Sequence, residues 1–288
     1  KEDFKEATKY FDEVSGEEKY KEKLSYFQAD MNFKLGKFQK AIDLGKAAMS
    51  KSNAIEKSEL NKIIGESYFN LKQYDVALPF LVEYKGKKGK WNNTDYYQLG
   101  YAYYQQKQYD NAISQFNKII DGNDFVAQNA YYHLGESYLK SDKKQEALNA
   151  FKNASEMDFD LKIKEDAHLN YAKISYEIGN SYQSVPEVLT TFLEKYPTSP
   201  SHDVIETLLI NSFITSKNYK QALVLLEKNK TSLNKETYQK VAFYRGLELY
   251  IDGNYNEAKD LFSKSIKEQR NAEFTARALF WKAEVEYV

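Results

Sequence analysis

The chain lacks cysteine, and this absence removes several classes of chemistry at once. None of its 288 residues is Cys, which excludes disulfide scaffolds, thiolate zinc sites, iron–sulfur clusters and cysteine nucleophiles. The compartment stays open, because a chain without Cys suits reducing and oxidising surroundings alike. With only 4 Pro and 12 Gly, the composition leaves room for long helices.

The chain also has no excess of positive or negative charge and no long apolar run. Its 41 basic and 42 acidic residues leave a formal net charge of -1, so no global field attracts nucleic acid or an anionic membrane. No apolar run approaches the roughly 20 residues that span a bilayer, and no signal-peptide pattern opens the sequence. The 42% hydrophobic content, with 25 Tyr, is enough for a real core.

One motif recurs at a fixed interval. Gly65, Gly100 and Gly135 stand 35 residues apart, and each is followed by a Tyr three residues later and an Ala twelve residues later. Spacings of this kind trace one stripe on each of two helices, and the polar residues between them predict a short turn. Small residues let the two helices approach closely, and one such hairpin cannot bury both its faces, so neighbouring hairpins must stack.

This pattern resembles the tetratricopeptide-repeat family, whose period is about 34 residues. The small site of the first helix falls at Ala29, Gly65, Gly100, Gly135, Ala172, Ile210, Gly246 and Ala283. The Ala site of the second helix falls at Ala7, Ala41, Ala77, Ala112, Ala147, Val185, Ala222 and Ala258. In most repeats a large apolar residue follows the second site by four residues, as Phe116 follows Ala112.

The resemblance implies an all-α fold, an α-solenoid (right-handed superhelix) of helix-turn-helix hairpins with about seven full repeats and a half repeat at each end. The expected boundaries are a second helix at 1–16, repeats at 17–52, 53–88, 89–122, 123–158, 159–198, 199–233 and 234–270, and a first helix at 271–288. Repeat 159–198 is longer, with Val185 and Pro186 at its Ala site. In repeat 53–88, Pro79 stands two residues after Ala77 and predicts a late start or a kink in the second helix of that repeat. Because the array starts and stops mid-repeat, we expect a piece of a longer protein.

No residue pattern predicts catalysis, a cofactor or a metal site. The triplets that begin at Gly65 and Gly135 lack the second Gly of a nucleophile elbow. His133, His168 and His202 fall in three different repeats without the convergent ligands that a metal needs. We expect these His to serve packing or the surface. The basic cluster at residues 85–90 is interpreted as a solvated turn, with binding of phosphate or of an acidic partner as the alternative.

The resemblance also implies a concave groove, lined by first-helix residues three before, one after and four after the small site. The candidate partner-binding residues are Tyr97, Tyr101, Tyr104, Tyr132, Glu66, Phe69, Glu136, Lys173 and Tyr176. The same path continues through Asn211, Phe243, Tyr250 and Phe280. Tyr offers contact area with a polar tip, which suits peptide recognition. The alternative is that many of these rings pack on the adjacent repeat. The carboxylate clamp of some family members is rejected, because Thr207, Tyr244 and Trp281 occupy its other positions.

These observations favour a non-catalytic scaffold that binds a protein or peptide, with no nucleic acid and no direct membrane insertion in this chain. We expect any self-association through the uncapped ends to be an artefact of excision. Residues 192–200 resemble the repeat ending of tetratricopeptide proteins of the bacterial envelope, and Lys outnumbers Arg 38 to 3, as is typical of low-GC genomes. We therefore expect a periplasmic or envelope-associated protein, with a cytoplasmic one as the alternative. The alternative function is a regulatory or sensor region fused to a kinase or DNA-binding module.

Overall fold

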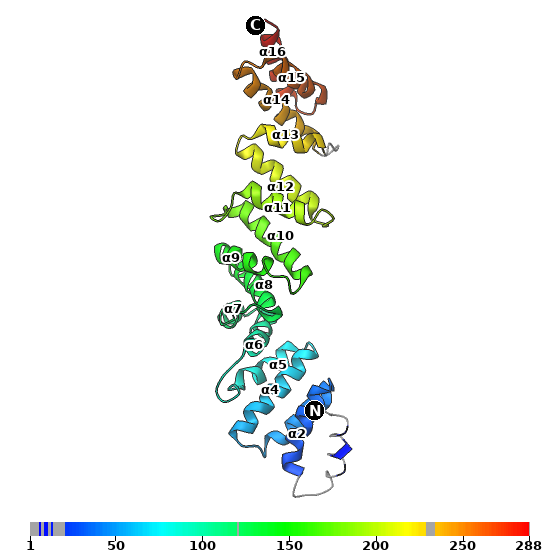
Figure 1. The fold of residues 1–288 in the computed structure, drawn as a ribbon, viewed down its shortest axis with the longest axis vertical. Coiled ribbons are helices and arrows are strands. Elements are labelled where there is room, and N and C mark those ends of the chain that lie inside the picture. The colour runs from blue at the N-terminus through cyan, green and yellow to red at the C-terminus, as the bar shows by residue number, and fades with distance from the viewer. Residues whose placement is uncertain are drawn as a thin grey trace. The chain divides into compact units, whose positions relative to one another are not determined.

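The computed structural model describes residues 21–119, 121–228 and 234–287, together with Glu6, Lys9, Tyr10 and Glu13. These residues form helices joined by turns and loops, with one isolated bridge between Lys87 and Lys90 and no β-strand among them (Figure 1). The prediction of an all-α helical-repeat fold is confirmed. The half repeat expected at 1–16, with its Ala7, lies outside the described residues except for those four positions.

The chain divides into two compact units, Lys1–Tyr171 and Ala172–Val288, and the division falls inside α10 (Leu161–Ile178). The helices of the first unit are α2 (Lys21–Lys34), α3 (Phe38–Met49), α4 (Ala54–Asn70), α5 (Tyr74–Glu83), α6 (Asn93–Gln105), α7 (Tyr109–Phe116), α8 (Phe125–Lys140) and α9 (Lys144–Ser155). Those of the second are α11 (Val185–Lys195), α12 (His202–Thr215), α13 (Tyr219–Lys228), α14 (Lys235–Ile251), α15 (Tyr255–Glu268) and α16 (Ala272–Tyr287).

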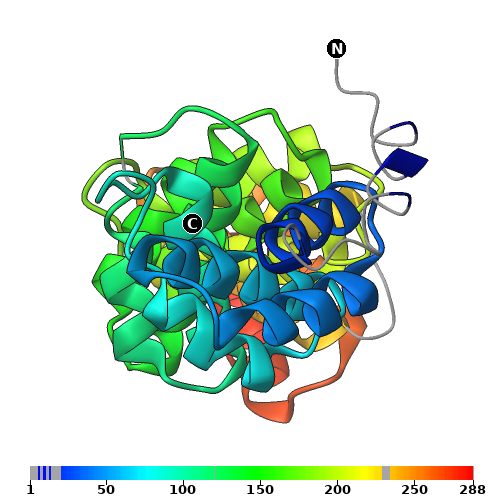
Figure 2. The same ribbon diagram turned by 90° about the horizontal axis from the view of Figure 1, so that it is seen from below.

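Helices that follow each other in the chain pack against each other. In the first unit α2 packs on α3, α4 on α5, α6 on α7 and α8 on α9; in the second, α14 packs on α15. The blue helix α2 and the helix after it lie side by side in both views (Figures 1 and 2). In each of these pairs the even-numbered helix is the first helix of a hairpin, and the next one is the second.

The recurring glycines allow the two helices of a hairpin to touch. A methyl group on Gly100 would lie 2.8 Å from the Phe116 ring, and one on Gly246 would lie 2.8 Å from the Phe262 ring. Both rings are fully buried. The spacing of small and large residues therefore records a direct contact across each hairpin.

The turn inside each hairpin has the same backbone form. The residue seven after the small site takes a left-handed conformation in seven hairpins: Gly36, Lys72, Lys107, Asp142, Gly179, Lys217 and Gly253. Its φ lies between 57° for Asp142 and 81° for Gly179. This residue ends the first helix and directs the chain back along it.

Three details of the sequence interpretation are corrected by the structure. Val185 is the first residue of α11, and the buried position followed by a large ring four residues later is Val188, with Phe192 fully buried after it. Five residues, 180–184, separate the left-handed Gly179 from this helix, whereas one residue does so in the other hairpins, and the four additional residues explain the longer repeat. The late start expected from Pro79 is wrong, because α5 begins at Tyr74.

Candidate functional site

Three tyrosines of α6 form one continuous row. Tyr97, Tyr101 and Tyr104 are four and three residues apart, so they share a face of the helix. The ring centroids of Tyr97 and Tyr101 are 5.9 Å apart, and those of Tyr101 and Tyr104 are 6.0 Å apart. All three rings are half-buried, which leaves part of each accessible to a partner.

The row continues onto the preceding hairpin. Phe69 of α4 lies with its ring centroid 5.7 Å from that of Tyr101, and Tyr74 of α5 lies 5.3 Å from both. These edge-to-face contacts are the geometry that aromatic rings prefer. The surface therefore joins α4, α5 and α6 through ring contacts.

His133 of α8 lies at the centre of the surface. Its ring centroid is 4.8 Å from Tyr101, 5.4 Å from Tyr104 and 5.2 Å from Tyr132. Its Nδ1 lies 2.8 Å from Oε2 of Glu136, one turn further along the same helix. His133 was expected to serve packing or the surface and was not among the candidate residues. Its three-residue spacing from Glu136 places both side chains on one face of the helix and could have indicated it. We call Phe69, Tyr97, Tyr101, Tyr104, Tyr132, His133 and Glu136 the aromatic surface.

Burial keeps the hydroxyls of Tyr97, Tyr104 and Tyr132 protonated around neutral pH, because it raises the pKa of each. Burial raises the pKa of Tyr132 to about 12, and the carboxylates of Glu136 and Asp166 add to the effect. Burial also raises the pKa of Tyr97 and of Tyr104, where neighbouring hydroxyls and Glu136 contribute. A partner would thus meet apolar rings whose polar tips can donate hydrogen bonds.

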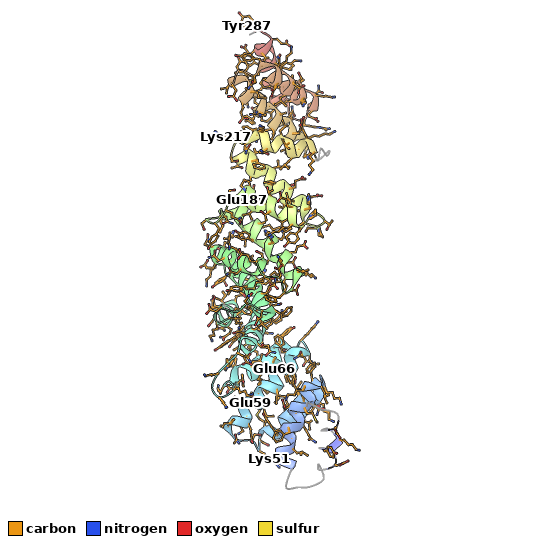
Figure 3. All side chains as sticks on the ribbon, viewed as in Figure 1. Lys51, Glu59, Glu66, Glu187, Lys217 and Tyr287 are labelled. Atoms are coloured by element: carbon orange, nitrogen blue, oxygen red, sulfur yellow. The ribbon has the colours of Figure 1, made fainter. Side chains whose placement is uncertain are left out.

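Glu66 of α4 lies in a buried polar cluster next to this surface, and Figure 3 labels it. Lys62 Nζ lies 3.8 Å from the Glu66 carboxylate and 2.5 Å from Oδ1 of Asp95 on α6. Burial raises the pKa of Glu66 to about 7, and Asp95 adds to the shift while Lys62 and Gln98 oppose it. Only 7% of Glu66 is exposed, so its position is interior rather than groove-lining.

Lys173 and Tyr176, the last two candidates, lie in the second unit. Both are exposed on α10. The other seven candidates lie within the first unit. Of the further path, Phe243 is fully buried and cannot face a partner, whereas Phe280 is 59% exposed.

The sequence interpretation also missed a set of buried polar residues seven positions before the small site. Gln128 is fully buried, donates to the carbonyls of Ala154, Met157 and Asp160, and accepts from the Asp160 amide. Ser58, at the same repeat position, accepts from the Lys85 amide. Each residue satisfies backbone groups in the loop that leads to the next hairpin.

The described residues contain no group of three His, Asp or Glu side chains placed to hold a metal ion. Nor is any described helix long and apolar enough to cross a membrane. Residues 85–90 form a loop whose lysines are exposed, and Trp91 beside them lies between Tyr84 and Tyr96 with ring centroids 5.5 and 5.3 Å away.

A comparison with family models matches residues 80–154 to the anaphase-promoting complex, cyclosome, subunit 3 family, which is of the tetratricopeptide type. The matched stretch holds hairpins α6–α7 and α8–α9, with their small-site glycines and left-handed turns. This stretch is similar to tetratricopeptide repeats. No curated protein matches it.

Several solved structures are similar to this chain. The C-terminal part of a repeat protein from Cytophaga hutchinsonii is 14% identical, with a TM-score of 0.46 over 88% of this chain and 98% of that one. A tetratricopeptide repeat protein from Parabacteroides merdae is 17% identical, with a TM-score of 0.44 over 88% and 99%. MamA from Desulfovibrio magneticus is 19% identical, with a TM-score of 0.46 over 63% and 98%.

Proposed function

We propose that this chain is a non-catalytic scaffold that binds an extended peptide segment of a protein partner on the aromatic surface. A tetratricopeptide-repeat fold supports a protein-interaction role in general. The observation that carries the proposal is the contact of half-buried rings of α6 with His133 of α8, with Phe69 of α4 packed on Tyr101 beside them. Rigid aromatic side chains give contact area at low cost in rotamer entropy.

A double substitution tests this surface. Tyr101→Ala with Tyr132→Ala removes two rings that touch His133, so capture of a pulled-down partner should weaken by at least ~10-fold, since aromatic anchors dominate many interfaces. Tyr182→Ala, at a residue 55% exposed in the second unit, is the matched control and should leave capture unchanged. Circular dichroism should show both variants folded. Unchanged capture by the folded double variant would rule out the aromatic surface as the binding site.

Self-association is a second candidate, favoured by α16. Leu279 and Phe280 on this helix are 53% and 59% exposed, and adjacent exposed apolar side chains favour contact with another chain. We propose that a second copy covers them. Light scattering of the purified chain should show dimers or larger species, and Leu279→Glu with Phe280→Glu should give the monomer mass. A wild-type monomer at high concentration would contradict this candidate.

We further propose a bacterial envelope location, supported by the resemblance of residues 192–200. In the structure Phe192 of this segment is buried and Tyr196 packs on it with ring centroids 5.0 Å apart, so the motif also has a structural role. Fractionation of cells should recover the full-length protein with the periplasm or envelope, and recovery only from the cytosol would contradict the proposal. The sequence of the full-length gene tests the regulatory alternative, which requires a kinase or DNA-binding module.

A further inference from the structure

A cavity of about 530 Å³ opens in the second unit, outside all nine candidate residues. Its lining comes from α12, the turn after it, α13 and α14. Ile214, Leu247 and Ile251 supply aliphatic surface. Tyr219 and Tyr244 line it as a stacked pair, with ring centroids 5.0 Å apart and an interplanar angle of 14°. The cavity thus offers an apolar surface large enough for a side chain.

Two lysines carry the positive charge of this cavity. Lys217 is the left-handed residue of the turn, with a φ of 59°, and Figure 3 labels it. Lys240 comes from α14, and both are exposed. Within the described part of the chain, neither ammonium group has an ion-pair or hydrogen-bond partner. Their positive charge is therefore available to a ligand.

The acid that lines the cavity does not cancel this charge. Glu248 is paired with Arg245, whose Nη1 lies 2.9 Å from Oε2 of Glu248. Arg277 of α16 lies with its guanidinium carbon 6.0 Å from the Tyr244 ring centroid, but it is paired with Glu273, whose Oε1 lies 3.4 Å from its Nη1, so Lys217 and Lys240 carry the excess charge. The cavity combines an apolar lining with a net positive charge.

We propose that this cavity binds an extended partner segment in which an aliphatic side chain stands next to an Asp or Glu. The aliphatic side chain would enter the cavity, with the stacked tyrosine pair on one side and the aliphatic lining on the other. The carboxylate would face Lys217 and Lys240. This inference rests on the proposed scaffold function, but it uses residues of the other unit. The two surfaces therefore differ in charge as well as in position along the sequence.

A blocked peptide is the appropriate probe. It carries two Leu-Glu pairs in a Gly/Ser background, with an acetylated amino end and an amidated carboxyl end, so that only side-chain carboxylates are present. Fluorescence anisotropy measures its binding to the full chain, with a Leu-Gln peptide as the isosteric comparison. We expect the Leu-Glu peptide to bind at low salt, to weaken as salt rises, and to bind at least ~10-fold more tightly than the Leu-Gln peptide.

Variants assign the binding to the cavity. Lys217→Gln with Lys240→Gln should weaken the Leu-Glu peptide by at least ~10-fold, whereas the control Lys267→Gln, an exposed lysine of α15, should not. Thermal unfolding establishes that each variant is folded. Equal binding of the two peptides, absence of binding, or an unchanged affinity in the double lysine variant would each overturn the proposal.

The aromatic-surface variant separates this inference from the proposed function. Tyr101→Ala with Tyr132→Ala should bind the Leu-Glu peptide as the wild type does, because neither residue lines the cavity. Loss of the peptide in this variant would place the acidic segment on the aromatic surface and overturn the cavity proposal. Loss of partner capture with retention of the peptide would support both proposals independently.

Discussion

The left-handed φ of the residue seven positions after the small site affects the stability of each hairpin turn. Four non-glycine residues, Lys72, Lys107, Asp142 and Lys217, hold the same left-handed conformation that Gly36, Gly179 and Gly253 hold in other hairpins. An L-residue with a side chain pays roughly 1–2 kcal/mol for this conformation. The turns of the lysine-bearing hairpins are therefore less stable than their glycine counterparts.

Lys107→Gly should raise the free energy of unfolding by about 0.5–1 kcal/mol, because relief of the left-handed strain exceeds the added flexibility of the unfolded chain. Urea unfolding followed by circular dichroism measures the change. The control is Lys267→Gly within α15, which should lower stability by about 1 kcal/mol. A loss of stability in Lys107→Gly would contradict the argument.

Glu66 makes stability depend on pH. Its pKa rises from the ordinary 4.5 to about 7 in the folded chain, so between these values the folded state holds a proton that the unfolded state releases. Stability should therefore be greatest below the lower value and fall as pH increases to about 7, by up to ~3 kcal/mol. Urea unfolding across this range measures the slope, and Glu66→Gln should flatten it. Glu83→Gln, at an exposed residue, should leave it unchanged.

At the scale of secondary-structure elements, a buried glutamine ties one hairpin to the next. Gln239 of α14 is fully buried; it accepts from the amides of Arg270 and Asn271 and donates to the Asn271 carbonyl and the Thr275 hydroxyl. The loop between α15 and α16 thereby obtains hydrogen bonds that it cannot make within itself. Gln128 does the same for the loop between α9 and α10.

Gln239→Leu should lower the free energy of unfolding by about 2–4 kcal/mol, because buried amides and a carbonyl lose their partners. Hydrogen exchange should speed up at the amides of Arg270 and Asn271 before other sites respond. Gln221→Leu, at an exposed residue of α13, should change stability by less than ~0.5 kcal/mol. Unaltered exchange at the two amides would show that the side chain does not protect this loop.

At the scale of the whole molecule, helices contact near neighbours in the chain. Among the described helices, pairs with several contacts are at most two positions apart in chain order. Stability in such an array is close to a sum of repeat and nearest-neighbour terms. A local defect should therefore have local effects.

Gly246→Ala should reduce hydrogen-exchange protection in α14 to α16 far more than in α4 to α6, because its added methyl group would lie 2.8 Å from the Phe262 ring. Overpacking of this kind costs about 1–3 kcal/mol. Mass spectrometry of peptides from both units measures the protection, and Asn256→Ala serves as a nearby surface control. An equal loss in both sets of helices would contradict nearest-neighbour behaviour.

The sequence predicted the hairpins because their contacts are close in sequence and use recognisable sizes, as Gly100 and Phe116 do. It misplaced Val185, since the extra loop residues before α11 shift the register, and it could not tell that Phe243 is covered on all sides. His133 was missed because two of its ring contacts, with Tyr101 and Tyr104, come from another hairpin. Positions fixed by one hairpin were predictable; side-chain neighbours across hairpins needed the structure.

The hydrogen bonds of Gln128 define where this protein can be cut. A fragment that ends at Ser155, the last residue of α9, would remove Met157 and Asp160 and leave the Gln128 amide without most of its hydrogen-bond partners. A fragment that runs through the first turn of α10 keeps them. Fragments, domain insertions and transplanted repeats taken from this chain should therefore include the loop that follows each hairpin, because the independently usable module is longer than one sequence period.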